Sequence, residues 1–358
     1  MTSSPLDMVI LGQGLAGTAL AWQAHWAGLR FAIIDRDEPV TSSKIAAGLL
    51  TPITGQRLTA SWRWSKLWPV AVDFYRHVEH VTQRRFFRET SMVRTLADLE
   101  GFEQFKQRML VDEFYGNVRQ PPQPDLDAAA FTQMFGSFEM HDGGQLHVAE
   151  YLAASREFFR RQQLYLAADL DLEHDVEVND DGVDLPRFQL RAKRLMFCQG
   201  YAGVKNRWFG AVPFNPAKGE ILTVHIPGLK EERVLHGGVW IAPIGNERFR
   251  VGATYDWSRF DNVPTKEGRH EIETRLREWL RLPFTVEEHH AAVRPILRAP
   301  IPLLGFHPRW SQLGYFNGLA SKGSLMAPFF ARHLVRVMTA EETIDPTMDV
   351  ARRRELRL

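Results

Sequence analysis

The sequence predicts an α/β chain, α+β overall, that combines a doubly wound parallel-sheet domain with a second domain built mainly on an antiparallel sheet. Three observations carry this prediction. The first 35 residues read as strand, helix and strand in turn. Short apolar runs separated by Gly and Pro fill much of the region from residue 191 to residue 254. The C-terminal part then returns to a glycine-rich loop followed by an apolar helix.

The composition is that of ordinary globular material. The chain has 358 residues, of which 44% are hydrophobic and 24% charged, which is enough for two domains. Because 44 Lys and Arg balance 43 Asp and Glu, the overall charge gives no reason to expect nucleic acid or an anionic membrane as a partner. The single cysteine, Cys198, excludes an internal disulfide. We find no signal peptide and no apolar stretch of about 20 residues, so we expect a cytoplasmic protein without membrane contact.

The N-terminal unit begins with an apolar strand over residues 7–11. A glycine loop follows over residues 12–17, and an Ala-rich helix then runs to Ala27. A second strand over residues 30–35 closes the βαβ unit. Both strands are almost continuously apolar, which is typical of parallel strands covered on both faces.

The glycine loop predicts a site for the ADP half of a dinucleotide. Gly12 permits a tight turn, Gly14 lets the pyrophosphate approach the backbone, and Gly17 lets the helix pack closely on the strand. The helix that starts here presents unpaired N–H groups and its positive dipole end. Asp35, 18 residues after Gly17, can accept hydrogen bonds from the ribose hydroxyls. A purely structural glycine turn is the alternative, and the agreement of strand, helix and acid argues against it.

The fingerprint does not by itself distinguish FAD from NAD, since both carry the same ADP group. Three features favour FAD. The run of small residues over 42–48 lets the backbone approach a larger cofactor. No second glycine fingerprint is present for a separate nicotinamide nucleotide. The distant loop over 318–324 leads into a helix and can offer N–H groups to a flavin ring.

Further patterns predict the remaining elements. Helical spacing of apolar residues predicts helices over residues 62–80 and 148–163, and a proline-rich linker lies at 120–124. Alternating runs predict strands over 191–197, 220–225, 239–243 and 249–254, and a last helix spans about 326–338. We expect a discontinuous FAD-binding domain of residues 1–75, 145–205 and 301–358, and a substrate domain of residues 76–144 and 206–300.

Taken together, these segments resemble the D-amino-acid oxidase family of FAD-dependent oxidoreductases. That family includes glycine oxidase, sarcosine oxidase and the oxidase domain of the tRNA 5-methylaminomethyl-2-thiouridine biosynthesis enzyme. The motifs that carry the resemblance are Gly12 to Gly17 with Asp35, Ser43 to Gly48, Phe197 to Tyr201, Val251 to Asp256, Val293 to Pro295, and Gly318 to Pro328. The resemblance implies a Rossmann-like FAD-binding domain joined to a mainly antiparallel substrate domain.

The resemblance also implies FAD bound non-covalently by residues drawn from several segments. These are Gly12, Gly14, Leu15, Ala16, Gly17, Asp35, Arg36, Ser43, Lys44, Ala46, Ala47, Gly48, Val176, Gly200, Gly318, Lys322, Gly323 and Ser324.

The reaction implied by the resemblance removes a hydride from the carbon next to an amine, and the flavin carries the difficult chemistry. Arg294 matches the family position that binds the substrate carboxylate, for which a planar guanidinium fork is well suited. A surface or ion-paired arginine is the alternative, and Arg298 is a weaker candidate for the same role. The family often has an acid soon after this Arg-Pro pair, whereas here Ile296 and Leu297 follow.

Arg250 lies where some relatives carry a lysine that helps oxygen react at the flavin, so it is a second catalytic candidate. An exposed strand residue is the alternative interpretation for Arg250. We expect no metal site, because the pair His77 and His80 and the pair His270 and Glu271 lack further ligands at metal-binding spacing. The lone Cys198 is interpreted as a small buried hydrophobe.

Three functions stay open at this point. The first is an oxidase or dehydrogenase of a small amino acid or secondary amine. The second is an oxidase of the carboxymethylaminomethyl group on a tRNA wobble uridine. The segment Ser321 to Gly323 favours it, while the neutral charge and the lack of a fused methyltransferase domain disfavour it. The third is a protein that binds FAD for assembly or electron transfer with little turnover. The pattern does not fix the oligomeric state.

Overall fold

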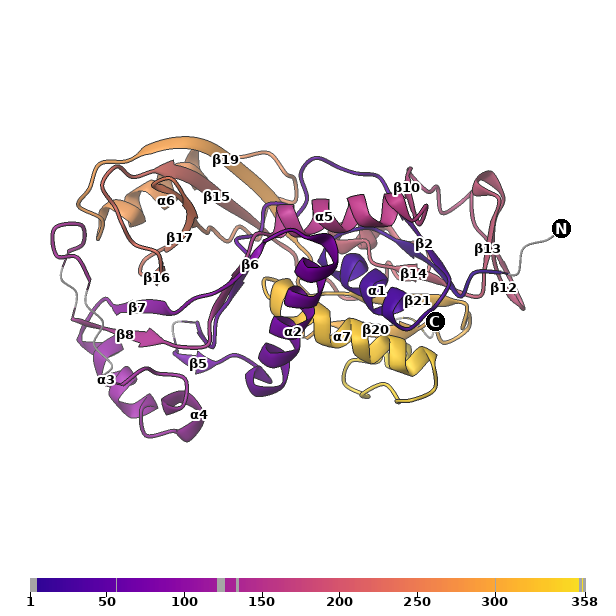
Figure 1. The fold of residues 1–358 in the computed structure, drawn as a ribbon, viewed down its shortest axis with the longest axis horizontal. Coiled ribbons are helices and arrows are strands. Elements are labelled where there is room, and N and C mark those ends of the chain that lie inside the picture. The colour runs from indigo at the N-terminus through magenta and orange to yellow at the C-terminus, as the bar shows by residue number, and fades with distance from the viewer. Residues whose placement is uncertain are drawn as a thin grey trace.

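The computed structural model describes residues 5–55, 57–120, 126–132, 135–299, 301–353 and 356. It is an elongated molecule of two halves, and one half contains both the N-terminal strands and the last helix of the chain (Figure 1). The proline-rich linker predicted at 120–124 lies, after its first residue, outside the described residues.

The first half is built on a six-stranded sheet. Its strand order is β10-β2-β1-β14-β21-β20, and all neighbours are parallel except the edge pair β21 and β20. The strands are β1 (Met8–Leu11), β2 (Phe31–Asp35), β10 (Tyr165–Ala167), β14 (Leu195–Phe197), β20 (Leu303–Phe306) and β21 (Leu313–Asn317). The predicted parallel pairing of the first two strands is confirmed, and β1 is buried throughout, as its apolar sequence requires.

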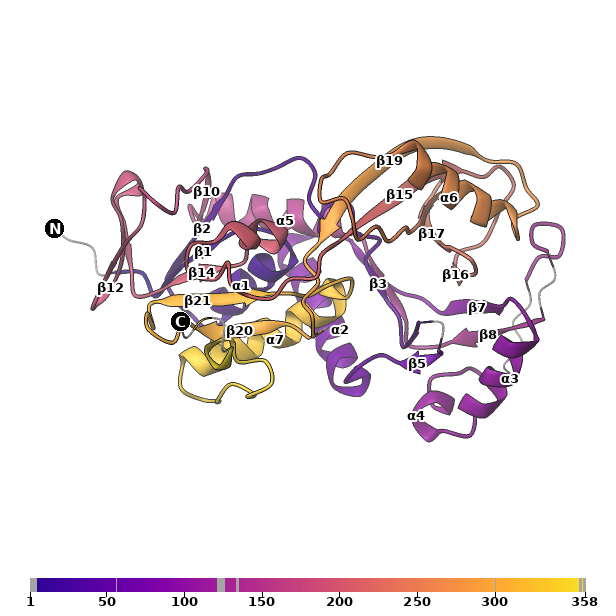
Figure 2. The same ribbon diagram turned by 180° about the vertical axis from the view of Figure 1, so that it is seen from behind.

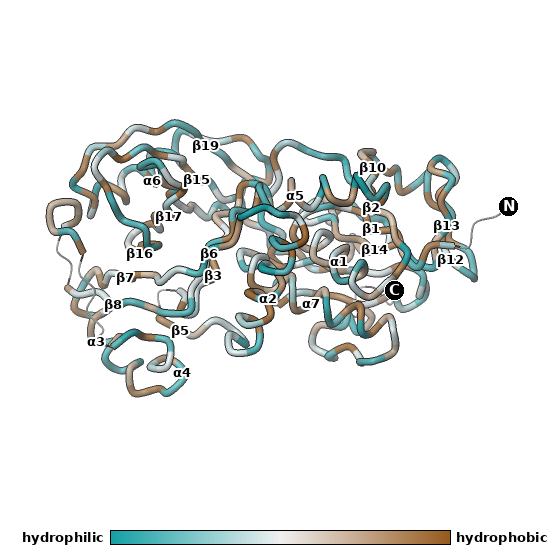
Figure 3. The backbone as a smooth tube through the Cα atoms, in the orientation of Figure 1, coloured by the Kyte–Doolittle hydropathy of each residue, from teal (hydrophilic) through white to brown (hydrophobic). Residues whose placement is uncertain are grey.

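Helices cover one face of this sheet. They are α1 (Leu15–Trp26), α2 (Trp64–Thr82), α5 (Val148–Arg161) and α7 (Gly323–Met338). Trp22 of α1 is fully buried among them, and its indole N–H donates to Ser155 Oγ of α5 at 2.9 Å. Hydrophobic stretches gather where α2 and α7 pass each other (Figure 3). The apolar residues of the helix predicted over 62–80 therefore form a packing surface.

The opposite face of the sheet lacks the helix layer that the predicted doubly wound fold would place there. A small antiparallel sheet and loops lie there in place of helices, and its strands are β11 (Glu177–Asn179), β12 (Gly182–Leu185) and β13 (Leu190–Ala192). The single strand predicted over 191–197 is split between β13 and β14. The charged pair Lys193 and Arg194 separates the two pieces, and Lys193 forms an ion pair with Asp7 at 2.9 Å.

The second half is built on a seven-stranded sheet of order β19-β15-β18-β17-β16-β7-β8. Its strands are β7 (Met92–Leu96), β8 (Gly136–Met140), β15 (Ala217–His225), β16 (Val234–His236), β17 (Trp240–Gly245), β18 (Arg248–Gly252) and β19 (Thr285–Arg294). All neighbours are antiparallel except β16 and β7, so the prediction of a mainly antiparallel sheet is confirmed. The sheet curls, with β15 and β19 above and β7 and β8 below (Figure 1).

Each face of the curled sheet has its own cover. The outer face packs on α6 (Lys266–Arg277). Thr265 caps the N-terminus of this helix, and its side chain accepts a hydrogen bond from Gly268 N. At the far end lie α3 (Leu99–Arg108) and α4 (Asp112–Tyr115), which Figure 2 shows from behind. The inner face looks toward the six-stranded half. Short strands connect the halves: β3 (Leu49–Leu50), β4 (Ile53–Thr54), β5 (Thr59–Ala60), β6 (Phe87–Glu89) and β9 (Gly144–Leu146).

We propose that the two halves are the two domains expected from the sequence, with segments 1–75, 145–205 and 301–358 in one and segments 76–144 and 206–300 in the other. One boundary is better moved. Because α2 is a single helix that continues to Thr82, and His77 stacks on Trp26 of α1, residues 76–82 belong with the first domain. Among the helices of the described residues, none is both long and apolar enough to cross a bilayer.

Candidate active site

A cavity of about 1280 Å³ connects the two halves. It extends from the glycine loop after β1 to the inner face of the seven-stranded sheet, so it is lined by both predicted domains. Ordinary small-molecule sites enclose roughly 300–1,000 Å³, so this cavity has room for a large cofactor and a further ligand.

At two of its three glycines, the glycine loop over residues 12–17 leaves no space for a side chain. Gly12 has a φ of +101°, and a Cβ atom there would lie 2.6 Å from the carbonyl oxygen of Cys198. A Cβ atom on Gly17 would lie 1.8 Å from the carbonyl oxygen of Gly12. Gly14 lines the cavity beside Ser43. The loop therefore has the geometry expected of a pyrophosphate cradle at a helix N-terminus.

Asp35 lies at the end of β2 and lines the same cavity. Its Oδ2 accepts a hydrogen bond from Gln13 N at 2.7 Å, and its Oδ1 accepts one from Asp37 N at 2.8 Å. Oδ1 also accepts one from the Tyr165 hydroxyl at 3.4 Å. Oδ2 keeps a further lone pair, so a ribose hydroxyl can still donate to it. The neighbouring Arg36 also lines the cavity and forms an ion pair with Glu38 at 2.9 Å.

The loop over residues 41–48 forms one wall of the cavity and is held from two sides. Ser43 Oγ accepts a hydrogen bond from Leu15 N at 3.1 Å, and Lys44 pairs with Asp37 at 3.0 Å. From the other half, Arg250 of β18 donates to the carbonyl oxygens of Ile45 at 2.5 Å and Ala46 at 2.9 Å. Burial lowers the pKa of Arg250 to about 10, so the guanidinium is still charged at neutral pH.

These contacts commit Arg250 to the loop. Its side chain does not line the cavity, whereas Ala46, Ala47 and Gly48 do. In the structure Arg250 therefore binds the loop over residues 41–48. No contact places its guanidinium where it would act on oxygen in the cavity.

The N-terminus of α7 forms the wall that faces the glycine loop. Lys322 Nζ donates to Thr54 Oγ1 and to Ser61 Oγ, each at 3.2 Å, and burial lowers the pKa of this lysine. Gly323 and Ser324 line the cavity with it, and a Cβ atom on Gly323 would lie 2.8 Å from Leu15 Cδ1. The Lys322 ammonium group and the N-terminus of α7 thus lie at the same part of the cavity wall, where they favour an anionic or electron-rich ligand.

The predicted cofactor residues come together at this cavity, which they all line except Gly17, Val176 and Gly318. Gly17 and Gly318 are next to lining residues. Val176 is buried in the core beneath the six-stranded sheet, and residues 169–173 form the nearby cavity wall instead. FAD fits this cavity for three reasons. Its glycines let a pyrophosphate reach the backbone, Asp35 at the end of β2 can bind a ribose, and the volume is large enough for a dinucleotide.

Arg294, the last residue of β19, lines the sheet end of the cavity. Its guanidinium donates to Thr254 O at 3.1 Å and lies 4.1 Å from the centre of the Tyr255 ring. It rests over Gly219, where a Cβ atom would lie only 2.0 Å from Nη2. Burial lowers its pKa, and we find no ion pair with an acidic residue in the described parts of the chain. Arg298, the weaker candidate, is exposed and does not line the cavity.

The sequence interpretation missed three residues on the floor of the cavity, namely Arg94, Trp240 and His236. One signal for Arg94 was available. It stands between Met92 and Leu96 on the apolar side of an alternating strand, where a charged residue is out of place. His236 and Trp240 gave no comparable signal, because only strand pairing brings them to the site.

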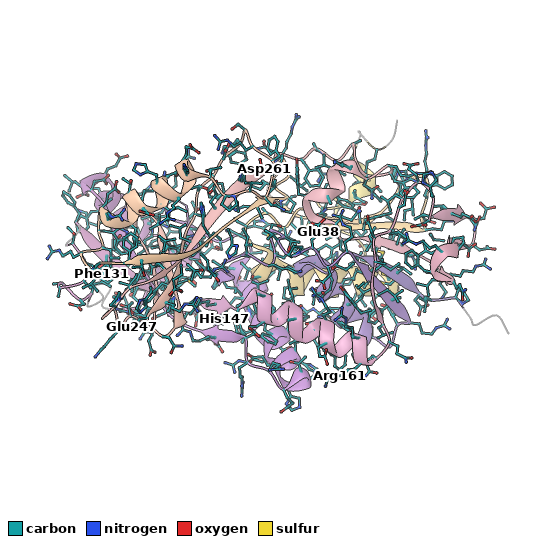
Figure 4. All side chains as sticks on the ribbon, turned by 90° about the horizontal axis from the view of Figure 1, so that it is seen from above. Glu38, Phe131, His147, Arg161, Glu247 and Asp261 are labelled. Carbon is teal, nitrogen blue, oxygen red and sulfur yellow. The ribbon has the colours of Figure 1, made fainter. Side chains whose placement is uncertain are left out.

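The two halves also touch beside the cavity. Asn262 Nδ2 donates to Val40 O at 3.3 Å, and Lys218 holds the neighbouring Asp261 at 2.6 Å. Figure 4 labels Asp261 and Glu38 on the two segments that make this contact.

Other candidate groups are accounted for by packing. His77 stacks on Trp26, with ring centres 4.5 Å apart, and burial raises the pKa of the Cys198 thiol well above its usual range. In the described parts of the chain, no group of three or more His, Cys, Asp or Glu residues is placed to hold a metal ion.

Comparison with known proteins agrees with this geometry. The family model described as FAD dependent oxidoreductase, DAO, matches residues 7–337. Glycine oxidase of Pseudomonas aeruginosa is 24% identical over 375 residues, covering 95% of this chain and 96% of the relative. The tRNA 5-methylaminomethyl-2-thiouridine biosynthesis bifunctional protein MnmC of Caulobacter vibrioides is 26% identical over 347 residues, covering 92% of this chain but 54% of the relative.

Among solved structures, glycine oxidase from Geobacillus kaustophilus superposes with a TM-score of 0.83 at 17% identity, covering 98% of this chain and all of that one. This likeness establishes the fold, and the family match extends over nearly the whole sequence. The chain therefore belongs to the DAO family of FAD-dependent oxidoreductases, the amino acid oxidase family, and it is an enzyme.

Proposed function

We propose that the enzyme oxidises the C–N bond of a small amino acid or secondary amine that bears a carboxylate, with hydride transfer to flavin. The observation that carries this proposal is the position of Arg294. It is a half-buried guanidinium at the sheet end of a cofactor-sized cavity, and no acidic residue of the described chain pairs with it. A carboxylate that arrives with the substrate would supply the missing partner.

The residues around Arg294 limit how such a substrate lies. One side of the guanidinium is occupied by Thr254 O and one face by Tyr255, which leaves its remaining donors for a ligand in the cavity. Gly219 leaves room for the guanidinium to lie flat against β15. A carboxylate held by two parallel hydrogen bonds has a fixed orientation, and the adjacent amine-bearing carbon is then fixed as well.

We assign FAD to the rest of the cavity, bound non-covalently. The ADP half would lie on Gly12, Gly14 and Asp35, and the flavin end would lie near Lys322 and the N-terminus of α7. When bound, the flavin accepts the hydride, and the oxidised substrate leaves as an imine that water hydrolyses. The only thiol, Cys198, lies against the glycine loop and is buried, which supports non-covalent binding and a reducing compartment such as the cytoplasm.

The protonation state of the amine follows from the charges at this end of the cavity. Arg94, Arg294 and Lys322 line it, and the acidic lining residues are all near the adenosine site. Nearby positive charges disfavour an ammonium ion. The substrate amine therefore gives up its proton to solvent and binds in its neutral form. We therefore expect flavin reduction at subsaturating substrate to become faster as the pH rises toward the pKa of the free amine.

Anaerobic mixing with glycine, sarcosine, proline and a set of D-amino acids tests the proposal. At least one of them should bleach the oxidised flavin in a saturable way. If none does, while dithionite still reduces the flavin, the small-substrate proposal is wrong.

A tRNA wobble uridine with a carboxymethylaminomethyl group is the second candidate. It is favoured by the likeness to the Caulobacter vibrioides protein named for that modification, of which this chain spans about half. The same N–CH₂–carboxylate group would meet Arg294. Incubation with tRNA carrying the group, followed by nucleoside mass analysis, would show loss of the carboxymethyl mass if this candidate is right.

A further inference from the structure

A second guanidinium, that of Arg94, faces the cavity and has no partner among the described residues. Arg94 lies in β7 between Met92 and Leu96, which are 0% and 4% exposed and point to the same face of the strand. Arg94 lines the cavity, and no hydrogen bond or ion pair involves its side chain in the described chain. Burial lowers its pKa without any acidic group to offset the effect. A half-buried guanidinium with no acidic neighbour in the described residues favours an anionic ligand.

Strand register places Arg94 and Arg294 on the same face of the seven-stranded sheet. Residues directly opposite one another in register point to the same side. One such row crosses five strands, and every member lines the cavity: Arg94, His236, Trp240, Gly252 and Ile221. Ile221 is two residues from Gly219, over which the Arg294 guanidinium rests. A continuous floor therefore runs from one guanidinium to the other.

The floor between the two charges is mostly apolar. Trp240 and Ile221 form its middle, and a Cβ atom on Gly252 would lie 2.9 Å from the Trp240 ring. His236 Nε2 is buried and has no hydrogen-bond partner, and burial together with Arg94 lowers the pKa of His236 to about 3. The neutral imidazole adds a polar group beside Arg94 without adding charge.

The acidic residues that line the cavity lie away from the two guanidinium groups, which also favours an anionic ligand between them. Acidic lining residues are gathered at the opposite end, on the segments that follow β2 and β10: Asp35, Glu38, Asp169, Asp171 and Glu173. None of the lining residues at the sheet end is acidic. Arg294 can be neutralised by the carboxylate of the proposed substrate, which leaves Arg94 without a counter-charge.

We propose that the substrate is an amino diacid in which Arg294 binds the carboxylate beside the reacting carbon and Arg94 binds a second acidic group across an apolar spacer. The proposal rests on the proposed function and narrows its substrate class. The Arg294 guanidinium lies over β15, and β7 is four strand spacings away, which is roughly 19 Å along a flat sheet and less across the curled one. The spacer therefore contains several carbons. The buried neighbours of Arg94 favour a small molecule over the phosphates of a nucleic acid.

Two matched series of compounds test the proposal on the FAD-loaded enzyme. One series is N-(ω-carboxyalkyl)glycines of increasing chain length. The other is N-alkylglycines of equal length that end in a methyl group. The dissociation constant of each compound is obtained from the concentration dependence of anaerobic flavin reduction. At the best spacer length the diacid should bind about 10- to 100-fold more tightly than its methyl-ended partner, the range expected for a hydrogen-bonded charge pair.

Variants assign that preference to a residue. Arg94→Met should abolish it, and Arg94→Lys, which keeps the charge but loses the planar fork, should reduce it at least about threefold. The control is Arg119→Met. Arg119 is beside the neighbouring strand β8, its side chain is 56% exposed, and it does not line the cavity, so this variant should keep the full preference. The Lys variant decides the matter if the Met variant does not fold.

The possible failures are distinguishable. If methyl-ended compounds reduce the flavin and the diacids bind no better at any length, the inference is wrong and the proposed function stands. A preference that survives in both Arg94 variants also overturns the inference. If neither series reduces the flavin although dithionite does, the proposed function fails and the inference falls with it.

Discussion

The contact between Arg250 and the loop over residues 41–48 gives a prediction for cofactor binding. In Arg250→Met, the carbonyl oxygens of Ile45 and Ala46 lose the donors that now lie at 2.5 and 2.9 Å. A hydrogen bond to a charged group contributes about 1.5–3 kcal/mol, so two of them contribute at least about 3 kcal/mol. If that energy holds the loop in its cofactor-binding form, FAD should bind about 100-fold more weakly.

Titration of the apoprotein with FAD, followed by quenching of flavin fluorescence, measures this effect. Arg248→Met is the matched control because Arg248 is two residues earlier on the same strand. Its side chain is 41% exposed and pairs with Glu287 at 2.6 Å, so its loss should change FAD affinity by less than about threefold.

The reasoning about Arg250 would be refuted by an Arg250→Met protein that binds FAD as tightly as the wild type. If in addition its reduced flavin reacted with oxygen much more slowly, Arg250 would act on oxygen, as the family resemblance suggested, and not on the loop.

Three further predictions follow from the site. Arg294→Met keeps the length of the side chain but removes its charge, so the substrate dissociation constant in anaerobic reduction should rise about 100-fold or more, and an unchanged value would remove Arg294 from the site. Gly219→Ala would place a Cβ atom 2.0 Å from Nη2 of Arg294, so it should raise the same constant while FAD affinity stays constant; wild-type substrate affinity would contradict the placement of Arg294. His236→Gln should make the fold less sensitive to acid, because it removes a group that binds a proton only in the unfolded chain. Between pH 7 and pH 5, the free energy of unfolding measured with urea should fall by about 2 kcal/mol more in the wild type than in the variant. Equal losses in the two proteins would contradict the burial of His236.

The direction of the pH effect follows from the two protonation equilibria of His236. Its folded-state pKa is lowered to about 3, whereas an unfolded histidine titrates near 6.5. Between these values the unfolded chain binds a proton that the folded protein does not, so stability is highest above about pH 6.5 and declines as the pH falls toward 3.

Local patterns in the sequence predicted the fold of the first βαβ unit. The strand, glycine loop, helix and Asp35 follow one another closely in the sequence, and the parallel pairing of β1 with β2 confirms their arrangement. That these residues bind a cofactor is still a prediction. The doubly wound arrangement predicted for the six-stranded sheet was wrong for its far face, because apolar strands require cover without specifying whether helices or a small sheet supply it.

The substrate half depends on contacts between distant segments, which periodicity does not encode. Arg94 and His236 are 142 positions apart and meet only through the parallel pairing of β7 with β16. Arg250 reaches Ala46 across 204 positions. Arg294 was predicted from a family motif, and its role is still a prediction, but its surroundings over Gly219 and Tyr255 became visible only in the folded chain.

Anaerobic single-turnover mixing of the FAD-loaded enzyme with an amine-bearing carboxylic acid is the most direct test of the central claim. We expect saturable bleaching of the flavin, with one equivalent of oxo acid formed per flavin reduced, and loss of saturation in Arg294→Met. Bleaching with equal affinity by the corresponding amines that lack the carboxylate would contradict it.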